Sequence, residues 1–192
     1  MQLLQNKAIQ TANFAFTVLL LSACSPRYDW REVRPAEGGW VASFPARVQS
    51  AVREIDLGGK RVSMAMHAAR VDGVAFAIGI ASLPEGSGEI ADQAPASLKA
   101  AMLRNIQGTI LREHAVTIQR SGKSLAPVPG SEIEADGKSG GERVRLAARF
   151  AAYRSARGGQ VVQIIVLGPS AELSKSVGHE AIETFMSSLR LD

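Results

Sequence analysis

Side chains that could bind a metal are few and scattered in this chain of 192 residues. The chain has three histidines, His67, His114 and His179. None of them lies near the single cysteine, Cys24. Glu113-His114 and His179-Glu180 each place an acid beside a histidine, but neither has the HExxH spacing that puts two zinc ligands on one helix face. We therefore expect neither a metal site nor another cofactor.

Residues that could act as a catalytic nucleophile or base are equally isolated. Gly86-Ser87-Gly88 lacks the strand-to-helix context of a nucleophile elbow. Gly137-Lys138-Ser139 lacks the leading glycine of a phosphate-binding loop, because Glu132 occupies that position. His67 falls on the polar face of an alternating segment, and no nucleophile can be paired with it from the sequence. We expect a solvated histidine, two surface turns and no enzymatic activity.

The cysteine follows a segment that is typical of export signals. Residues 1–13 are polar with one charge, Lys7, and Phe14–Ala23 is a run of apolar or small residues. A membrane-spanning helix needs about 20 apolar residues, whereas a short apolar core behind a basic start marks a secretory signal peptide. We therefore expect residues 1–23 to be a signal peptide.

Leu21, Ser22 and Ala23, in front of Cys24, resemble the bacterial lipobox. The resemblance implies transfer of diacylglycerol to the Cys24 thiol, cleavage before Cys24 and acylation of the new amino group. Two alternatives stay open: an ordinary signal peptide that leaves a free thiol, and a cysteine buried there by chance. Ser25, rather than aspartate, follows the cysteine. By resemblance to the sorting rule of enteric bacteria, this residue favours the outer membrane.

Composition and charge argue against a nucleic-acid partner. The chain is 46% hydrophobic and 21% charged, which is typical of a globular protein. It has 22 basic and 18 acidic residues, and removal of residues 1–23 takes away only Lys7. The small positive excess that remains is too weak to indicate nucleic-acid binding.

The rest of the chain divides into a tether and one domain. Residues 24–39 are turn-rich and charged, so we expect them to connect the lipid to the domain. Within this segment, Tyr28 and Trp30 could rest at the membrane interface or pack back on the domain. Residues 40–192 carry the alternating and apolar patterns of a single folded unit.

Alternation and glycine pairs predict a series of strand hairpins in this domain. The expected strands are 40–44, 48–57, 61–69, 74–80, 109–119, 142–153 and 160–167, with a short one at 131–135 inside a loop-rich segment, 121–141. Helical spacing predicts a helix over 97–107, capped by Ser97 and ended by Gly108, and another over 178–189. Hairpins with two helices indicate an α+β domain with a single sheet.

One strand carries a row of arginines. Arg143, Arg145 and Arg149 alternate with apolar residues and therefore share one strand face. This face is either solvated or faces an anion or an acidic partner, such as lipid headgroups or lipopolysaccharide phosphates. If helices cover it, the arginines must lie at an edge or form buried ion pairs.

The order of the elements resembles the PsbP-like fold, named for the extrinsic P subunit of photosystem II. The matching segments are 39–45, Gly58-Gly59, 74–84, 97–108, 159–169 and 185–191. The resemblance implies an α/β/α sandwich in which helices flank a single antiparallel sheet. It implies no enzyme, because the fold is mostly used for docking onto other proteins, and a likeness of fold is weak ground for function.

Together these features lead us to expect a bacterial lipoprotein held on a membrane by the lipid on Cys24, on the periplasmic face of the outer membrane. Its expected role is that of a non-enzymatic docking or assembly factor for an envelope protein. The alternative is a binder of a small or lipidic ligand in an apolar cleft.

Overall fold

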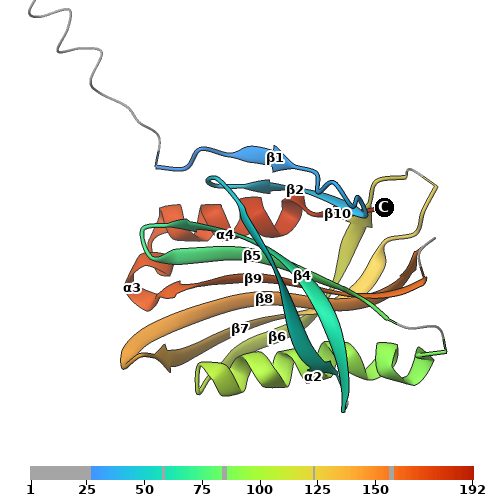
Figure 1. Ribbon diagram of the computed structural model, residues 1–192. Coiled ribbons are helices and arrows are strands. Elements are labelled where there is room, and N and C mark those ends of the chain that lie inside the picture. Colours follow the sequence, from blue (N-terminus) through green and yellow to red (C-terminus); the bar gives the residue numbers. More distant parts are fainter. Residues whose placement is uncertain (1–26, 58, 84–85, 123, 156–157) are drawn as a thin grey trace, which may run out of the picture.

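The computed structural model describes residues 27–192, apart from 58, 84, 85, 123, 156 and 157 (Figure 1). The expected lipid attachment site, Cys24, its preceding residues Leu21, Ser22 and Ala23, and Ser25 lie outside the described residues.

The described residues form a ten-stranded sheet. Its strands are β1 (Arg31–Val33), β2 (Trp40–Phe44), β3 (Gln49–Leu57), β4 (Lys60–Val71), β5 (Val74–Ser82), β6 (Thr109–Arg120), β7 (Val128–Ser139), β8 (Glu142–Ser155), β9 (Gly158–Pro169) and β10 (Arg190–Leu191). The strand order is β1-β2-β10-β6-β7-β8-β9-β5-β4-β3. Neighbours are antiparallel except β10 and β6, which are parallel.

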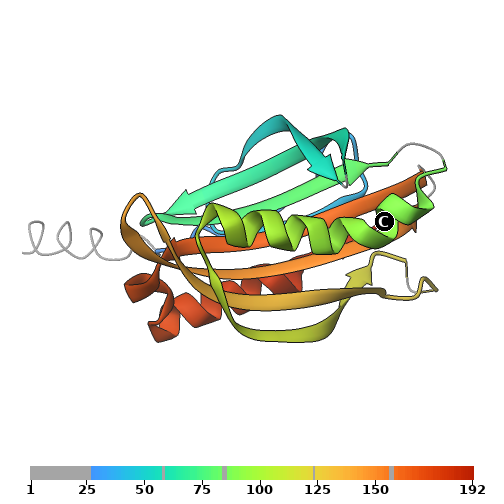
Figure 2. The ribbon, with the colours of Figure 1, turned by 90° about the horizontal axis from the view of Figure 1, so that it is seen from below.

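Within the described residues, three helices pack on this sheet: α2 (Gly88–Asn105), α3 (Ser170–Leu173) and α4 (Ser176–Ser188). The sheet curls so that α2 lies across β7, β8 and β9 and also contacts β3, at the end of the strand order (Figure 2). Leu98 of α2 belongs to one hydrophobic core, and Phe185 of α4 belongs to a second core that also contains Phe44 and Phe76. Among the described helices, none has the length and apolar character needed to cross a membrane.

The expected α+β fold, an α/β/α sandwich of PsbP-like type, is wrong. The structure is mostly β, with a large curled sheet in place of a sheet flanked by layers of helices (Figure 1). One physical reason is β7, which occupies most of the segment 121–141 that we read as loop because of its glycines and prolines. A second is β10, whose parallel pairing with β6 no hairpin pattern could reveal.

The glycines of β7 serve close packing instead of turns. A Cβ added at Gly130 would lie 2.7 Å from the carbonyl oxygen of Phe150, and one at Gly137 would lie 2.4 Å from that of Ile106. Both glycines therefore allow another backbone to approach the strand, which is a known role of glycine inside a sheet.

The first helix also differs from the expectation. It begins at Gly88 instead of Ser97, and it runs through Pro95 in the helix interior. Near its end the residue with positive φ is Gln107, at 49°, and not Gly108. Ser97 is a favourable helix cap by residue type and therefore pointed to a start inside the helix that actually forms.

The hairpin predictions are confirmed where paired glycines or Asp-Gly mark the turns. β3 pairs with β4 from Leu57↔Lys60 to Gln49↔Ala68 without a register shift. β4 pairs with β5 across Asp72-Gly73. β8 also pairs with β9, but there Gly158 and Gly159 lie within β9, opposite Ser155 and Arg154. β1 lies inside the segment expected to be a tether, and it pairs with β2.

Of the two alternatives for Tyr28 and Trp30, the structure favours packing on the domain. Their rings lie 6.3 and 6.4 Å from the ring of Phe76, in edge-to-face arrangements. Such aromatic contacts add to the burial of apolar surface.

Candidate functional site

A groove runs along β3, between this strand and the segment that connects β1 to β2. We call it the β3 groove; it has a volume of about 650 Å³ and its lining includes Val33, Pro35, Glu37, Ser50, Val52 and His67. β3 forms one end of the strand order, so among the described strands it pairs only with β4. The groove therefore lies beside an open sheet edge.

His67 is held at the floor of this groove by hydrogen bonds on both ring nitrogens. Its Nδ1 lies 2.8 Å from Ser50 Oγ, and its Nε2 lies 3.1 Å from Glu37 Oε1. His67 is 7% exposed, and its ring packs against that of Trp40 at 5.1 Å between ring centroids. The expected solvated histidine is thus wrong: this residue joins the segment between β1 and β2 to the β3–β4 hairpin.

A hydroxyl, an imidazole and a carboxylate in series have the order of a nucleophilic relay. Here, however, the hydroxyl lies on an extended edge strand, and the side chain of Glu37 is 53% exposed. A carboxylate in water orients and stabilises an imidazolium far less than a buried one. The arrangement therefore suits a structural role, in which these hydrogen bonds hold the two sides of the groove together.

The two long free edges of the sheet differ in how they are protected. β6 pairs with β10 only at its last two positions. Its pairing with β7, however, has a register shift between Ile110 and Arg112, and the strand carries three ionisable residues in a row, Arg112, Glu113 and His114. Bulges and charges of this kind prevent unwanted strand pairing. β3 has no register shift, and its first four residues, 49–52, are uncharged. Val52 is 69% exposed, the highest value among the described large hydrophobic residues.

The predicted arginine row faces α3 and α4, where most of its charge is paired. Arg149 forms an ion pair with Glu132 of β7 and donates a hydrogen bond of 2.8 Å to the Met186 carbonyl in the last turn of α4. Cations are favourable at this end of a helix, where carbonyl groups lack partners.

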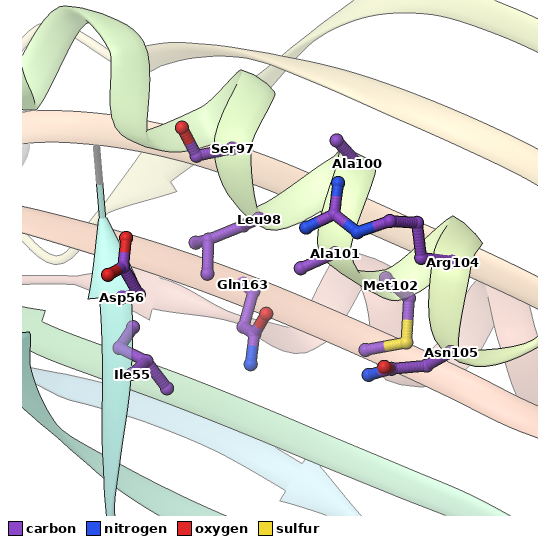
Figure 3. Close-up of a pocket in the computed structure, with 10 residues that line it drawn as sticks. All are labelled: Ile55, Asp56, Ser97, Leu98, Ala100, Ala101, Met102, Arg104, Asn105 and Gln163. Atoms are coloured by element: carbon purple, nitrogen blue, oxygen red, sulfur yellow. The ribbon is translucent and has the colours of Figure 1, made fainter. Parts of the chain in front are cut away.

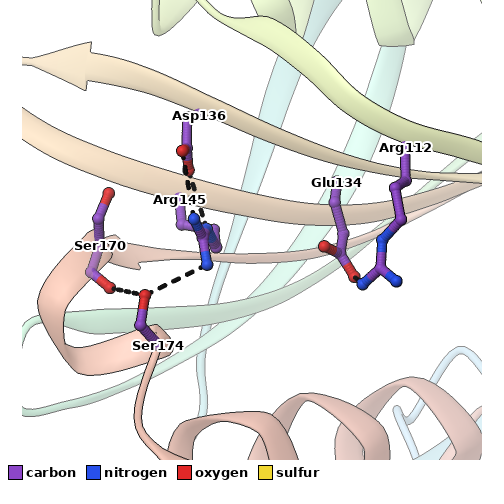
Figure 4. Close-up of polar contacts among 6 residues, drawn as sticks. All are labelled: Arg112, Glu134, Asp136, Arg145, Ser170 and Ser174. Atoms are coloured by element: carbon purple, nitrogen blue, oxygen red, sulfur yellow. Dashed lines mark hydrogen bonds and ion pairs between the residues drawn. The ribbon is translucent and has the colours of Figure 1, made fainter.

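Arg145 is held by Asp136 and by Ser174, the residue that follows α3, as Figure 4 shows. Two hydrogen bonds, of 2.8 and 3.2 Å, join its guanidinium to the Asp136 carboxylate, and a third reaches Ser174 Oγ. The guanidinium lowers the pKa of Asp136, and the carboxylate in turn raises the pKa of Arg145. The neighbouring pair of Arg112 and Glu134, also drawn in Figure 4, continues this row of alternating charges.

Arg143, the third member of the row, is exposed and forms no ion pair within the described part of the chain. It lines a cleft of about 1000 Å³ together with Arg145, Lys138 and residues of α3. Pairing with carboxylates thus takes up two of the three arginines, and the role of this face toward an anion or partner stays a prediction.

A further cleft of about 580 Å³ lies between α2 and β3 (Figure 3). We call it the α2 cleft; its lining includes Ile55, Leu98, Met102, Arg104 and Gln163. It combines apolar side chains with a few polar groups, which is typical of small-molecule sites.

The structure also shows how the histidines lie relative to other side chains that could bind a metal. Over the described residues, no three histidine, cysteine, aspartate or glutamate side chains gather as metal ligands would. His114 instead lies 3.6 Å from Glu132, at the side of the arginine row.

Comparison with known proteins gives little beyond overall shape. No protein family and no curated protein matches the sequence. The structure is similar to LpqN of Mycobacterium tuberculosis, a protein described as involved in cell envelope biogenesis, with a TM-score of 0.47 and 12% identity over 86% of this chain and 92% of that one. It is also similar to PA94 of Pseudomonas aeruginosa, a protein of unknown function, with a TM-score of 0.39 and 14% identity over 81% and 95% of the chains. At these scores neither likeness assigns a family or an activity to this chain.

Sequence reasoning missed the link between Ser50, His67 and Glu37, although part of its signal was present. Gly58-Gly59 predicts a two-residue turn, and such a turn fixes the register of the hairpin. Counting back from the observed pair Leu57↔Lys60 places Ser50 opposite His67. No local pattern indicates Glu37, because it reaches His67 across 30 positions of the sequence.

Proposed function

We propose that this protein is a lipid-anchored lipoprotein of the bacterial cell envelope that docks or assembles other envelope proteins without catalysing a reaction. In this proposal, an extended segment of an envelope protein adds to the open edge of β3 as a further strand. The observation that carries it is the contrast between the protected edge of β6 and the uncharged, bulge-free start of β3.

Strand addition uses the backbone groups that an edge strand leaves unpaired, while pockets beside the strand select side chains. β3 offers nine residues of edge, and the β3 groove beside it has apolar walls at Val33 and Val52. The first four residues of this edge, 49–52, carry no charge, and an uncharged edge is a liability unless another chain covers it. A protein that is permanently bound to β3 would cover this edge and prevent unwanted strand pairing there.

The anchor supports the proposal by keeping the groove close to the membrane. Cys24 precedes Arg31 of β1 by seven positions, a stretch that an extended chain spans in at most about 25 Å. Residues 33–37, which follow directly, form one wall of the β3 groove. Several acyl chains on Cys24 would hold the domain firmly and would raise its effective concentration toward a membrane partner. With Ser25 after the cysteine, we place the protein on the periplasmic face of the outer membrane.

Site-specific photocross-linking in cells tests the proposal. The photoreactive residue p-benzoylphenylalanine replaces Val52 in one strain and, as the matched control, Leu111 on the protected edge of β6 in another. We expect one discrete cross-linked product from position 52 and none from position 111. Ala51→Lys should abolish that product, because an added lysine blocks an edge strand from pairing, and Cys24→Ala should reduce it.

Two kinds of result would contradict the proposal, one concerning docking on β3 and the other concerning the lipid anchor. Absence of a product at position 52, or equal products at both positions, contradicts docking on β3. Cross-linking that is as efficient in Cys24→Ala as in the natural chain contradicts the role of the anchor.

A further inference from the structure

The α2 cleft contains a polar side chain that the fold engages only through weak acceptors. Gln163 of β9 is 7% exposed and extends toward the space between α2 and β3 (Figure 3). Its Nε2 donates to the sulfur atoms of Met64 and Met66, at 3.2 and 3.6 Å. Thioether sulfur is a weak acceptor, and the Gln163 Oε1 has no hydrogen-bond partner among the described residues. Gln163 Oε1 is not among the fully buried atoms that lack a partner, so it is accessible from the cleft and can accept a hydrogen bond from a ligand there.

The rim of the cleft carries one cation without a counter-charge. Arg104, in the last turn of α2, is exposed and forms no ion pair with any residue that the structure describes. Asp56, on the opposite rim, instead accepts a hydrogen bond of 2.8 Å from the Gly59 backbone in the β3–β4 turn. The rim of the cleft therefore has a negative side at Asp56 and a positive side at Arg104, and an anionic head group fits the Arg104 side.

Between Gln163 and Arg104, the walls of the α2 cleft are apolar, and their side chains can change conformation. Ile55, Leu98 and Met102 line the cleft, and Met64 and Met66 stand beside Gln163. Methionine side chains are flexible and polarisable, so they adjust to apolar ligands of variable shape. The volume of about 580 Å³ lies in the ordinary range for sites that bury a small molecule.

We infer that the α2 cleft binds an anionic single-chain amphiphile that carries a hydroxyl group, the chemistry of a lysophospholipid. The acyl chain packs along Ile55, Leu98 and Met102. The hydroxyl donates to Gln163 Oε1, and the phosphate meets the Arg104 guanidinium. This inference uses a different face of the molecule from the β3 groove and does not depend on strand docking or on Cys24.

Native mass spectrometry of the full chain, purified in a non-ionic alkyl glycoside detergent, tests this inference. The probe is 1-palmitoyl-lysophosphatidylglycerol, and 1-palmitoyl-lysophosphatidylcholine, whose head is zwitterionic, is the matched ligand. We expect one molecule of the anionic probe per chain, bound about fivefold more tightly than the zwitterionic one, since an exposed ion pair contributes modestly.

Three variants separate the parts of the site. Arg104→Gln should abolish the preference for the anionic head, whereas Arg70→Gln, at an exposed arginine outside the cleft, should preserve it. Gln163→Leu should weaken binding of both lipids about tenfold, because the ligand hydroxyl loses its buried partner. Ala101→Trp should prevent binding by filling the cleft.

The inference is overturned by failure of the natural chain to bind either lipid. It is equally overturned if both lipids bind with the same affinity, or if binding survives Ala101→Trp in a chain that keeps the far-ultraviolet circular dichroism of the natural one. These results leave the docking proposal untouched, because no cleft variant alters the edge of β3.

Discussion

Ser50 and His67 face each other across the β3–β4 ladder, with Ser50 Oγ 2.8 Å from His67 Nδ1. The same imidazole reaches Glu37 through its other nitrogen, at 3.1 Å. One buried side chain therefore connects a β-hairpin to the segment that follows β1. Because the β3 groove lies between these two parts, its shape depends on this contact.

His67→Ala should lower the free energy of unfolding by about 1–3 kcal/mol. The change removes two hydrogen bonds and leaves a gap beside the Trp40 ring. His114→Ala is the matched control, because the side chain of His114 is 57% exposed, and it should change the free energy by less than about 0.5 kcal/mol. Urea unfolding of both variants measures the difference. Equal values would contradict a structural role for His67.

Ser50 should stay unmodified by a fluorophosphonate, which labels activated serine nucleophiles. A relay needs a base that the carboxylate holds in a low dielectric and donors that receive the developing oxyanion, whereas the Glu37 side chain is half exposed. Intact-mass measurement of the natural chain and of Ser50→Ala after treatment provides the comparison. Labelling of the natural chain that Ser50→Ala abolishes would show that this serine is activated and that the protein is an enzyme.

The sequence indicates the hairpins well because their turns are local. Gly58-Gly59 and Asp72-Gly73 force tight turns, and alternation on each side of them fixes which residues face the core. Glycine was misleading in β7, where the same residue type serves close backbone approach at Gly130 and Gly137. Non-local pairs left no sequence signal, as the contact of Arg149 with the Met186 carbonyl illustrates.

Gly130→Ala should destabilise the protein by about 1–3 kcal/mol, as overpacking of a filled site does. The added methyl group would meet the Phe150 carbonyl oxygen at 2.7 Å, and a backbone atom inside a sheet cannot move aside. The control is Gly159→Ala, where the nearest side-chain atom, of Leu83, is 3.6 Å away. Thermal unfolding should place the first variant well below the second. Similar melting temperatures would contradict the packing role assigned to Gly130.

The pair of Asp136 and Arg145 predicts a specific dependence of stability on pH. The guanidinium lowers the pKa of Asp136, so the folded chain holds the carboxyl proton more weakly than the unfolded chain does. The stabilisation is therefore complete above the unfolded pKa of about 3.9, and it is lost as the pH falls through the lower folded value. Because the Asp136 side chain is 44% exposed, its contribution should not exceed about 1 kcal/mol.

Asp136→Asn tests this dependence through urea unfolding at a series of pH values. We expect the variant to be less stable than the natural chain at pH 7, and we expect this difference to shrink as the pH falls and the natural carboxyl group becomes protonated. Asp92→Asn is the control, since Asp92 is exposed and forms no ion pair within the described residues, and it should leave the pH profile unchanged. A difference between Asp136→Asn and the natural chain that stays constant down to pH 2 would mean that Asp136 acts through packing, not through its charge.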